Sequence, residues 1–127
     1  MELIQYLKQK LGDNLVSIIQ FGSSIYGKEN PEDIDILVIT ENPVYEDLSF
    51  DRYSIIVLTK KDFVRNILEE SPLLIGIVLM GYKVLYDKNN FFYTYLPAIL
   101  NRISREDLIY KRGKIYRCPT SSSRKHF

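Results

Sequence analysis

The chain has 127 residues, 46% of them hydrophobic and 26% charged, and a formal net charge of +1. These values are typical of a single soluble globular domain, and the balanced charge argues neither for nor against a nucleic-acid partner. A single cysteine and a single histidine exclude an internal disulfide, a zinc site and a hydrolase built on Ser-His or Cys-His pairs.

The N-terminal segment predicts an amphipathic helix over residues 1–11, because its apolar residues stand at positions 3, 4, 7 and 11. This spacing is unlike that of a signal peptide. The longest apolar stretch, residues 72–80, is too short to span a bilayer and is interrupted by Gly76. We therefore expect a cytoplasmic protein without a membrane segment.

Two apolar runs flank a turn of small residues. Residues 15–21 predict a first strand that is buried on both faces, because its apolar character is nearly continuous. Residues 34–40 predict a second strand. The connection between them begins with Gly22 and Ser23, and it predicts a short helix over residues 23–29 before a turn.

Two carboxylates stand at the head of the second strand. Asp33 and Asp35 are one residue apart and therefore project from the same face. Two bare carboxylates at about 4 Å repel by roughly 4 kcal/mol at an effective dielectric near 20, so a cation, a basic side chain or a proton must offset the repulsion. Mg²⁺ binds one or two protein carboxylates, while the Gly22-Ser23 turn offers a hydroxyl and backbone N–H groups to phosphate. The motif predicts a site for a nucleoside triphosphate and its metal ion.

The alternation of helices and strands in the remaining chain predicts an α/β fold. The pattern gives a loop over residues 41–50, a strand over 53–59, a helix over 60–70 capped by Thr59, a buried helix over 72–80, a strand over 83–86 and a long helix over 89–110. We expect residues 1–110 to form the domain and residues 111–127 a basic C-terminal tail.

Basic and aromatic residues in this second half allow more than one interpretation. The tail carries six basic residues and no acid, which fits either a solvated end or an arm for RNA, a triphosphate or an acidic partner. Lys60 and Lys61 are either solvent-facing residues at a helix start or phosphate ligands. The aromatic cluster around Tyr93 and Tyr95 fits the core, a homodimer contact or a docking face.

The spacing Gly-Ser, four residues on a glycine, then Asp-x-Asp on the next strand resembles the minimal nucleotidyltransferase family of the polymerase-β-like nucleotidyltransferase superfamily. The resemblance extends as far as residues 85–87. It implies a small mixed sheet with its helices packed mainly on one face. It implies that the nucleotide contacts Gly22, Ser23, Ser24 and Gly27. It also implies that Asp33 and Asp35 hold Mg²⁺.

One position departs from the family pattern. These enzymes carry a third carboxylate on the next strand, where this chain has Ser54. The nearest acid, Asp51, lies an odd number of residues away and faces the opposite side of a regular strand, unless a bulge at Arg52-Tyr53 restores its direction. Asp51 is the candidate third catalytic acid, and Glu46 and Asp47 are weaker candidates.

Two functions follow as hypotheses. The first is a Mg²⁺-dependent nucleotidyltransferase that moves a nucleoside monophosphate, AMP from ATP, to a hydroxyl group on a protein or another acceptor. The resemblance implies for this enzyme a helical HEPN-type partner in a toxin–antitoxin module. The second is a catalytically degraded protein of the same fold that docks a partner or binds a nucleotide without turnover.

Overall fold

The computed structural model describes residues 2–22, 25, 33–106, 108–111 and 114–117. The predicted nucleotide ligands Ser23, Ser24 and Gly27 lie outside the described residues, as does the predicted helix over 23–29 apart from Ile25. The elements in chain order are α1 (Glu2–Leu11), η1 (Gly12–Asn14), β1 (Leu15–Phe21), β2 (Ile34–Thr40), β3 (Tyr53–Thr59), α2 (Lys60–Leu68), α3 (Pro72–Met80), β4 (Tyr82–Asp87), η3 (Lys88–Asn90), α4 (Phe91–Glu106), β5 (Leu108–Lys111) and β6 (Lys114–Arg117).

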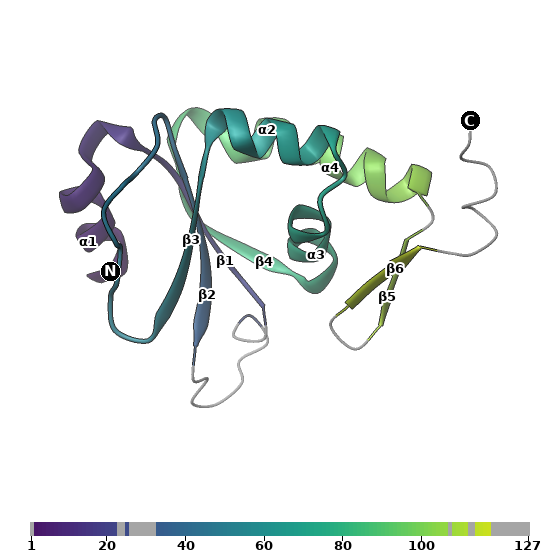
Figure 1. The fold of residues 1–127 in the computed structure, drawn as a ribbon, viewed down its shortest axis with the longest axis horizontal. Helices are drawn as coiled ribbons and strands as arrows, with labels where there is room; N and C mark the ends of the chain where they lie inside the picture. Colours follow the sequence, from purple (N-terminus) through teal and green to yellow (C-terminus); the bar gives the residue numbers. More distant parts are fainter. Residues whose placement is uncertain (1, 23–24, 26–32, 107, 112–113, 118–127) are drawn as a thin grey trace.

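The predicted mixed sheet is confirmed. Its four strands are ordered β3-β2-β1-β4 (Figure 1). Strand β1 is antiparallel to both β2 and β4, whereas β2 is parallel to β3. One row of paired residues crosses the whole sheet, because Phe21 pairs with Asp35 and with Tyr82, and Asp35 pairs with Ser54.

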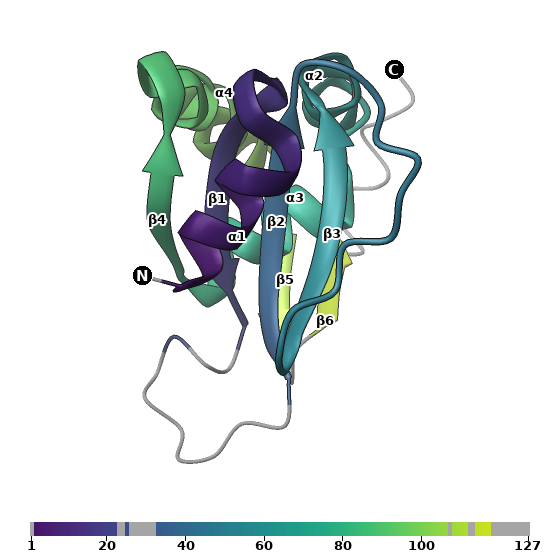
Figure 2. The ribbon, with the colours of Figure 1, turned by 90° about the vertical axis from the view of Figure 1, so that its left-hand side faces the viewer.

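Helices cover both faces of this sheet, unequally. Helix α1 packs its buried leucines against one face, together with Ile18, Ile36 and Val38 (Figure 2). Helices α2, α3 and α4 pack on the opposite face against Ile19 and Leu37. Neighbouring residues of β1 and β2 thus enter different apolar clusters, as the side-chain alternation of a strand requires. The expectation of helices mainly on one face is confirmed.

Most element boundaries agree with the sequence pattern. Strands β1, β2 and β3 have the predicted bounds. The hydroxyl of Thr59 accepts a hydrogen bond from the Asp62 N–H at 3.0 Å, which confirms the predicted cap of α2. Helix α2 ends at Leu68, two residues earlier than predicted, and Glu70 has a left-handed φ of 57°.

The prediction of one helix over residues 89–110 is wrong at both ends. Asn89 and Asn90 each have a φ of 54°, so α4 begins only at Phe91. Beyond Glu106, residues 108–111 pair antiparallel with residues 114–117. Both segments contain an isoleucine beside a tyrosine, residue types that favour strands.

The hairpin of β5 and β6 lies beside α3 (Figure 1). Helix α3 has the sequence PLLIGIVLM, which is apolar around its whole circumference. Such a helix needs cover on its outer side as well as on the side facing the sheet. Part of the predicted tail is therefore a strand next to the core, while the proposed division of the chain at residue 110 stays a prediction.

The aromatic cluster at the start of α4 belongs mainly to the core. Phe92 is fully buried, and the ring centroids of Phe91 and Phe92 lie 5.6 and 6.0 Å from that of Phe63 in α2. Tyr93 is half exposed. No helix in the described parts of the chain has both the length and the hydropathy needed to cross a bilayer.

Candidate active site

The two predicted acids lie at the start of β2. Asp35 occupies the same face of β2 as Leu37 and Ile39, which is the face covered by α2, α3 and α4. Asp33 immediately precedes the strand and is exposed, and Asp35 is half-buried. The structure therefore opens this acidic pair to solvent at the edge of the core.

The pKa of Asp35 indicates that the two carboxylates lie close enough to repel each other. The pKa of Asp35 is raised above its ordinary value, first by burial and second by the negative charge of Asp33. Both causes penalise the ionised form of Asp35. A cation bound between the two groups would remove the repulsion.

Gly22, the first residue after β1, lies next to the Asp35 carboxylate. Its φ is 84°, and a Cβ added at this position would lie 2.5 Å from Oδ2 of Asp35. Only glycine fits so close an approach. The N–H of Ile25 donates to the carbonyl of Gly22 at 3.1 Å, so the chain turns directly after β1. Gly22 and Asp35, 13 positions apart in the sequence, are thus neighbours in space.

Ser54, in β3, is the next residue of the site to consider. It pairs with Asp35 in the continuous parallel register between β2 and β3, so both side chains project from one face. Residues 34–40 pair one to one with residues 53–59, so the paired part of β3 contains no bulge, whereas Asp51 and Arg52 precede it in a turn. The structure thus places Ser54 beside Asp35, and the replacement of the family's third carboxylate by this serine stays a prediction.

Asp51 lies in the turn before β3, with a left-handed φ of 48°. Within the parts of the chain that the structure describes, no group of three or more His, Cys, Asp or Glu residues could hold a metal ion. Glu46 lies 4.0 Å from the ammonium of Lys10 in α1, the helix on the other face of the sheet. The catalytic role of Asp51 stays a prediction.

The two carboxylates supply part of the ligands that a Mg²⁺ site needs. Two carboxylates beside a glycine that admits close backbone approach match a Mg²⁺ ion that completes its shell with water and phosphate oxygens. A third protein carboxylate is not part of this set among the described residues.

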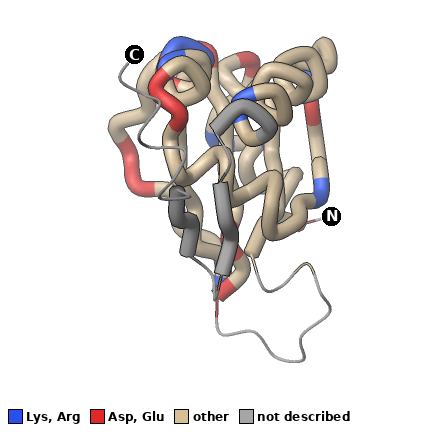
Figure 3. Tube along the Cα trace, turned by 90° about the vertical axis from the view of Figure 1, so that its right-hand side faces the viewer, with Lys and Arg blue, Asp and Glu red and all other residues tan. Residues whose placement is uncertain are grey.

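Lys60, considered above as a phosphate ligand, lies away from the acid pair. Lys60 follows the end of β3, and β3 runs parallel to β2, so this lysine lies at the opposite end of the sheet from Asp35. Figure 3 shows acidic and basic residues at several separate places along the described trace. The basic tail considered as an RNA arm, residues 111–127, has side chains that lie outside the described part of the structure.

Comparisons with known proteins agree on one family and one fold. A model of the nucleotidyltransferase domain matches residues 1–98. The "Putative protein adenylyltransferase" of Methanocaldococcus jannaschii is 37% identical over 121 residues, covering 82% of this chain and 80% of that protein. A crystal structure described as a toxin-antitoxin with AMP-PNP superposes with a TM-score of 0.52 at 16% identity, over 84% of this chain and 87% of that one.

Proposed function

The chain belongs to the nucleotidyltransferase domain family, and from this premise we propose that it transfers AMP from ATP to a hydroxyl group of a protein acceptor. The observation that supports this most is the contact between Gly22 and Asp35, with Asp33 beside them. The name of the Methanocaldococcus relative supports adenylyl transfer to a protein in particular.

In this proposal, Asp33 and Asp35 hold Mg²⁺, and the turn after Gly22 receives the triphosphate. When bound, the metal neutralises phosphate charge and stabilises the departing pyrophosphate. Gly22 lets the backbone approach the phosphates, Ser23 and Ser24 offer hydroxyl donors, and Gly27 is a further proposed nucleotide ligand.

The reaction joins the acceptor oxygen to the α-phosphorus and breaks the bond from that phosphorus to the oxygen bridging to the β-phosphate. Pyrophosphate leaves with this oxygen, and the acceptor hydroxyl gives its proton to a base. Ser54 is a poor base at neutral pH because its hydroxyl is not ionised. Asp51 is our candidate for this role, either directly or through water.

A second function is favoured by one observation, the pairing of Ser54 with Asp35 where the family pattern has a third acid. Without that carboxylate the protein binds a nucleotide or a partner without turnover. In both cases a helical HEPN-type partner, as in a toxin–antitoxin pair, is the proposed binding protein. A homodimer is a further possibility for the assembly.

The deciding experiment is calorimetric titration of ATP with Mg²⁺, followed by mass spectrometry for adenylylated protein. Asp33→Asn and Asp35→Asn should abolish binding, whereas Asp13→Asn, a matched change at an exposed aspartate, should not. Asp51→Asn should leave binding intact and remove transfer.

The two functions differ in their outcomes. Binding and transfer that both depend on the acid pair support the enzyme. Binding without any transfer supports the degraded protein, and absence of Mg²⁺-dependent binding in the wild type contradicts the nucleotide site altogether.

A further inference from the structure

A groove of about 310 Å³ lies at the end of the sheet opposite the acid pair. Its lining comes from the start of β1, the residue after β2, the start of α2, η3 and the beginning of α4. This volume is at the lower end of the range found for small-molecule sites.

The groove is separate from the candidate active site. Asp35 stands near the start of β2, and Glu41, which lines the groove, directly follows the end of that strand. Six residues of extended chain separate the two positions by about 20 Å at a rise near 3.3 Å per residue. A ligand in the groove therefore touches none of the acid pair.

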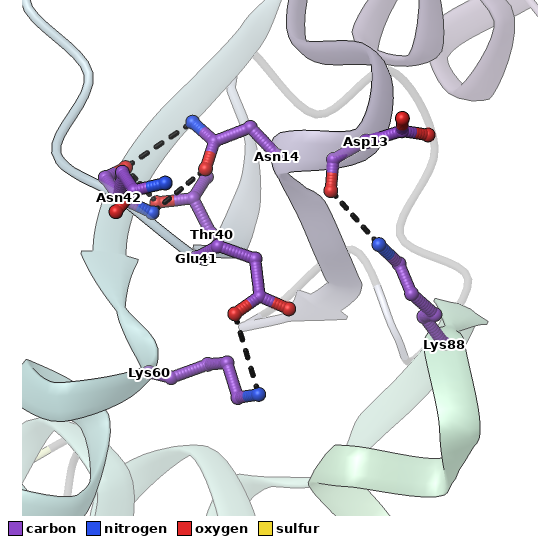
Figure 4. Close-up of polar contacts among 7 residues, drawn as sticks. All are labelled: Asp13, Asn14, Thr40, Glu41, Asn42, Lys60 and Lys88. Carbon is purple, nitrogen blue, oxygen red and sulfur yellow. Dashed lines mark hydrogen bonds and ion pairs between the residues drawn. The ribbon is translucent and has the colours of Figure 1, made fainter.

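Two lysines approach the groove from opposite sides (Figure 4). The ammonium of Lys60 lies 3.4 Å from the Glu41 carboxylate and 5.2 Å from the centre of the Phe91 ring. The ammonium of Lys88 donates to the carbonyl of Asp13 at 2.8 Å. An ammonium has three N–H donors, so both lysines are held in place while keeping donors for a ligand.

Rings and an apolar floor lie beside these cations. The centroids of Phe91 and Tyr95 are 5.0 Å apart, and both residues line the groove. Val16 also lines the groove and is only 2% exposed. Cations next to rings suit a ligand with a charged end and a flat or aliphatic body.

We propose that this groove binds a small organic anion, whose phosphate or carboxylate lies between Lys60 and Lys88 and whose body lies on Phe91 and Tyr95. Glu41 sets the strength of binding, because its carboxylate competes with the ligand for Lys60. The Lys60 and Glu41 side chains are 40% and 42% exposed, so a ligand reaches both from solvent.

The test uses phenyl phosphate, which carries both parts of the proposed ligand. It is titrated into the full chain in EDTA without nucleotide, and the backbone amide signals are followed by NMR. We expect saturable binding with a dissociation constant on the order of 1 mM, with shifts at residues 88–95 and around Lys60. The signals of Gly22 and Asp35 should not move.

Benzoate and inorganic phosphate are titrated in parallel. Tighter binding of phenyl phosphate than of benzoate assigns a phosphate ligand, and the reverse order assigns a carboxylate. Inorganic phosphate should bind more weakly than phenyl phosphate because it has no body to lie on the two rings.

Charge variants give the sharper test, because they predict effects of opposite sign. Lys60→Gln and Lys88→Gln should each weaken binding about fivefold, and Glu41→Gln should strengthen it about threefold. Lys61→Gln is the matched control, because Lys61 is the exposed neighbour of Lys60 and does not line the groove.

Three results overturn the proposal: no saturable binding, shifts that map outside the groove, or equal weakening by Lys61→Gln. Thermal melts of each variant show that folding is unchanged. None of these measurements depends on ATP or on transfer, so failure here is distinguishable from failure of the proposed function.

Discussion

At position 22 the candidate site leaves no room for a side chain larger than the hydrogen of glycine. Gly22→Ala places a methyl group 2.5 Å from the Asp35 carboxylate and pushes that group aside. We expect Mg²⁺-dependent ATP binding to fall more than tenfold and the free energy of unfolding to fall by about 1–2 kcal/mol. Calorimetry and urea denaturation measure the two effects.

Gly12→Ala is the control for backbone strain. Gly12 also has a positive φ, 54°, but an added Cβ there meets nothing within 4 Å. Its substitution should cost about 1 kcal/mol of stability and leave ATP binding unchanged. Equal loss of binding in both variants would show that strain, not the contact with Asp35, is responsible.

Asp35 should make stability depend on pH. Its folded-state pKa is raised by burial and by Asp33, so the folded state favours the protonated form. The resulting stability is fully present below the unfolded-state pKa and is lost as pH rises through the folded-state value.

Asp35→Asn should remove this loss of stability at higher pH, because asparagine does not ionise. In EDTA the variant should melt at a higher temperature than the wild type at about pH 7, and the difference should shrink as the pH falls toward about 3.5. Adding Mg²⁺ and ATP at neutral pH should raise the melting temperature of the wild type alone. A constant difference across the pH range would contradict the repulsion.

Among the elements, α4 is anchored to the sheet by one carboxylate. Asp87, the last residue of β4, accepts a hydrogen bond from the buried Ser17 hydroxyl of β1 at 2.5 Å. It also accepts from the N–H groups of Phe92 and Tyr93 at 3.0 and 3.2 Å, and so caps α4.

Asp87→Ala should lower the free energy of unfolding by about 2–4 kcal/mol, because it removes the cap and leaves a buried hydroxyl unpaired. Ser17→Ala keeps the cap and removes only the hydroxyl, so its cost should be smaller, at most about 2 kcal/mol. Urea denaturation of both variants tests the order. A larger loss in Ser17→Ala would show that the cap contributes little.

The elements that the sequence predicts well are those whose apolar spacing is local. Strands β1 to β3 have continuous apolar runs, and the α2 cap is visible as a threonine three residues before an aspartate. The failure over residues 89–110 has a physical reason. A pair of asparagines in left-handed conformation and the pairing of β5 with β6 are not visible in helical periodicity.

In the candidate site, too, local features can be predicted from the sequence and non-local ones cannot. Gly22, Asp33 and Asp35 fall within one short motif, so the sequence alone brings them together, whereas the pairing of Ser54 with Asp35 comes from the strand register of the structure. The groove at the other end of the sheet is assembled from residues between 16 and 95. No local pattern joins such distant residues, so the fold had to be known first.

For the whole molecule, the hairpin beside α3 should add stability. A chain ending after Arg117 should melt like the full chain. A chain ending after Glu106 lacks β6, the strand beside α3, and its free energy of unfolding should fall by an amount on the order of 2 kcal/mol, about that of exposing one large aliphatic side chain. Thermal melts of both truncations measure this, and equal stability would show that the hairpin gives α3 no cover.

The two apolar clusters of the sheet are completed by different lengths of chain. All fully buried members on the α1 side lie between residues 3 and 38, with partly buried residues up to Tyr86 packed around them, whereas the buried members on the other side extend from 16 to 99. On the ribosome, where the N-terminal part emerges first, the buried centre of the α1 side can assemble while the opposite face of β1 and β2 waits for α4. The nascent chain therefore passes through a stage in which the centre of one face is packed and the other face is open, and chaperones that bind exposed apolar strands would meet it there.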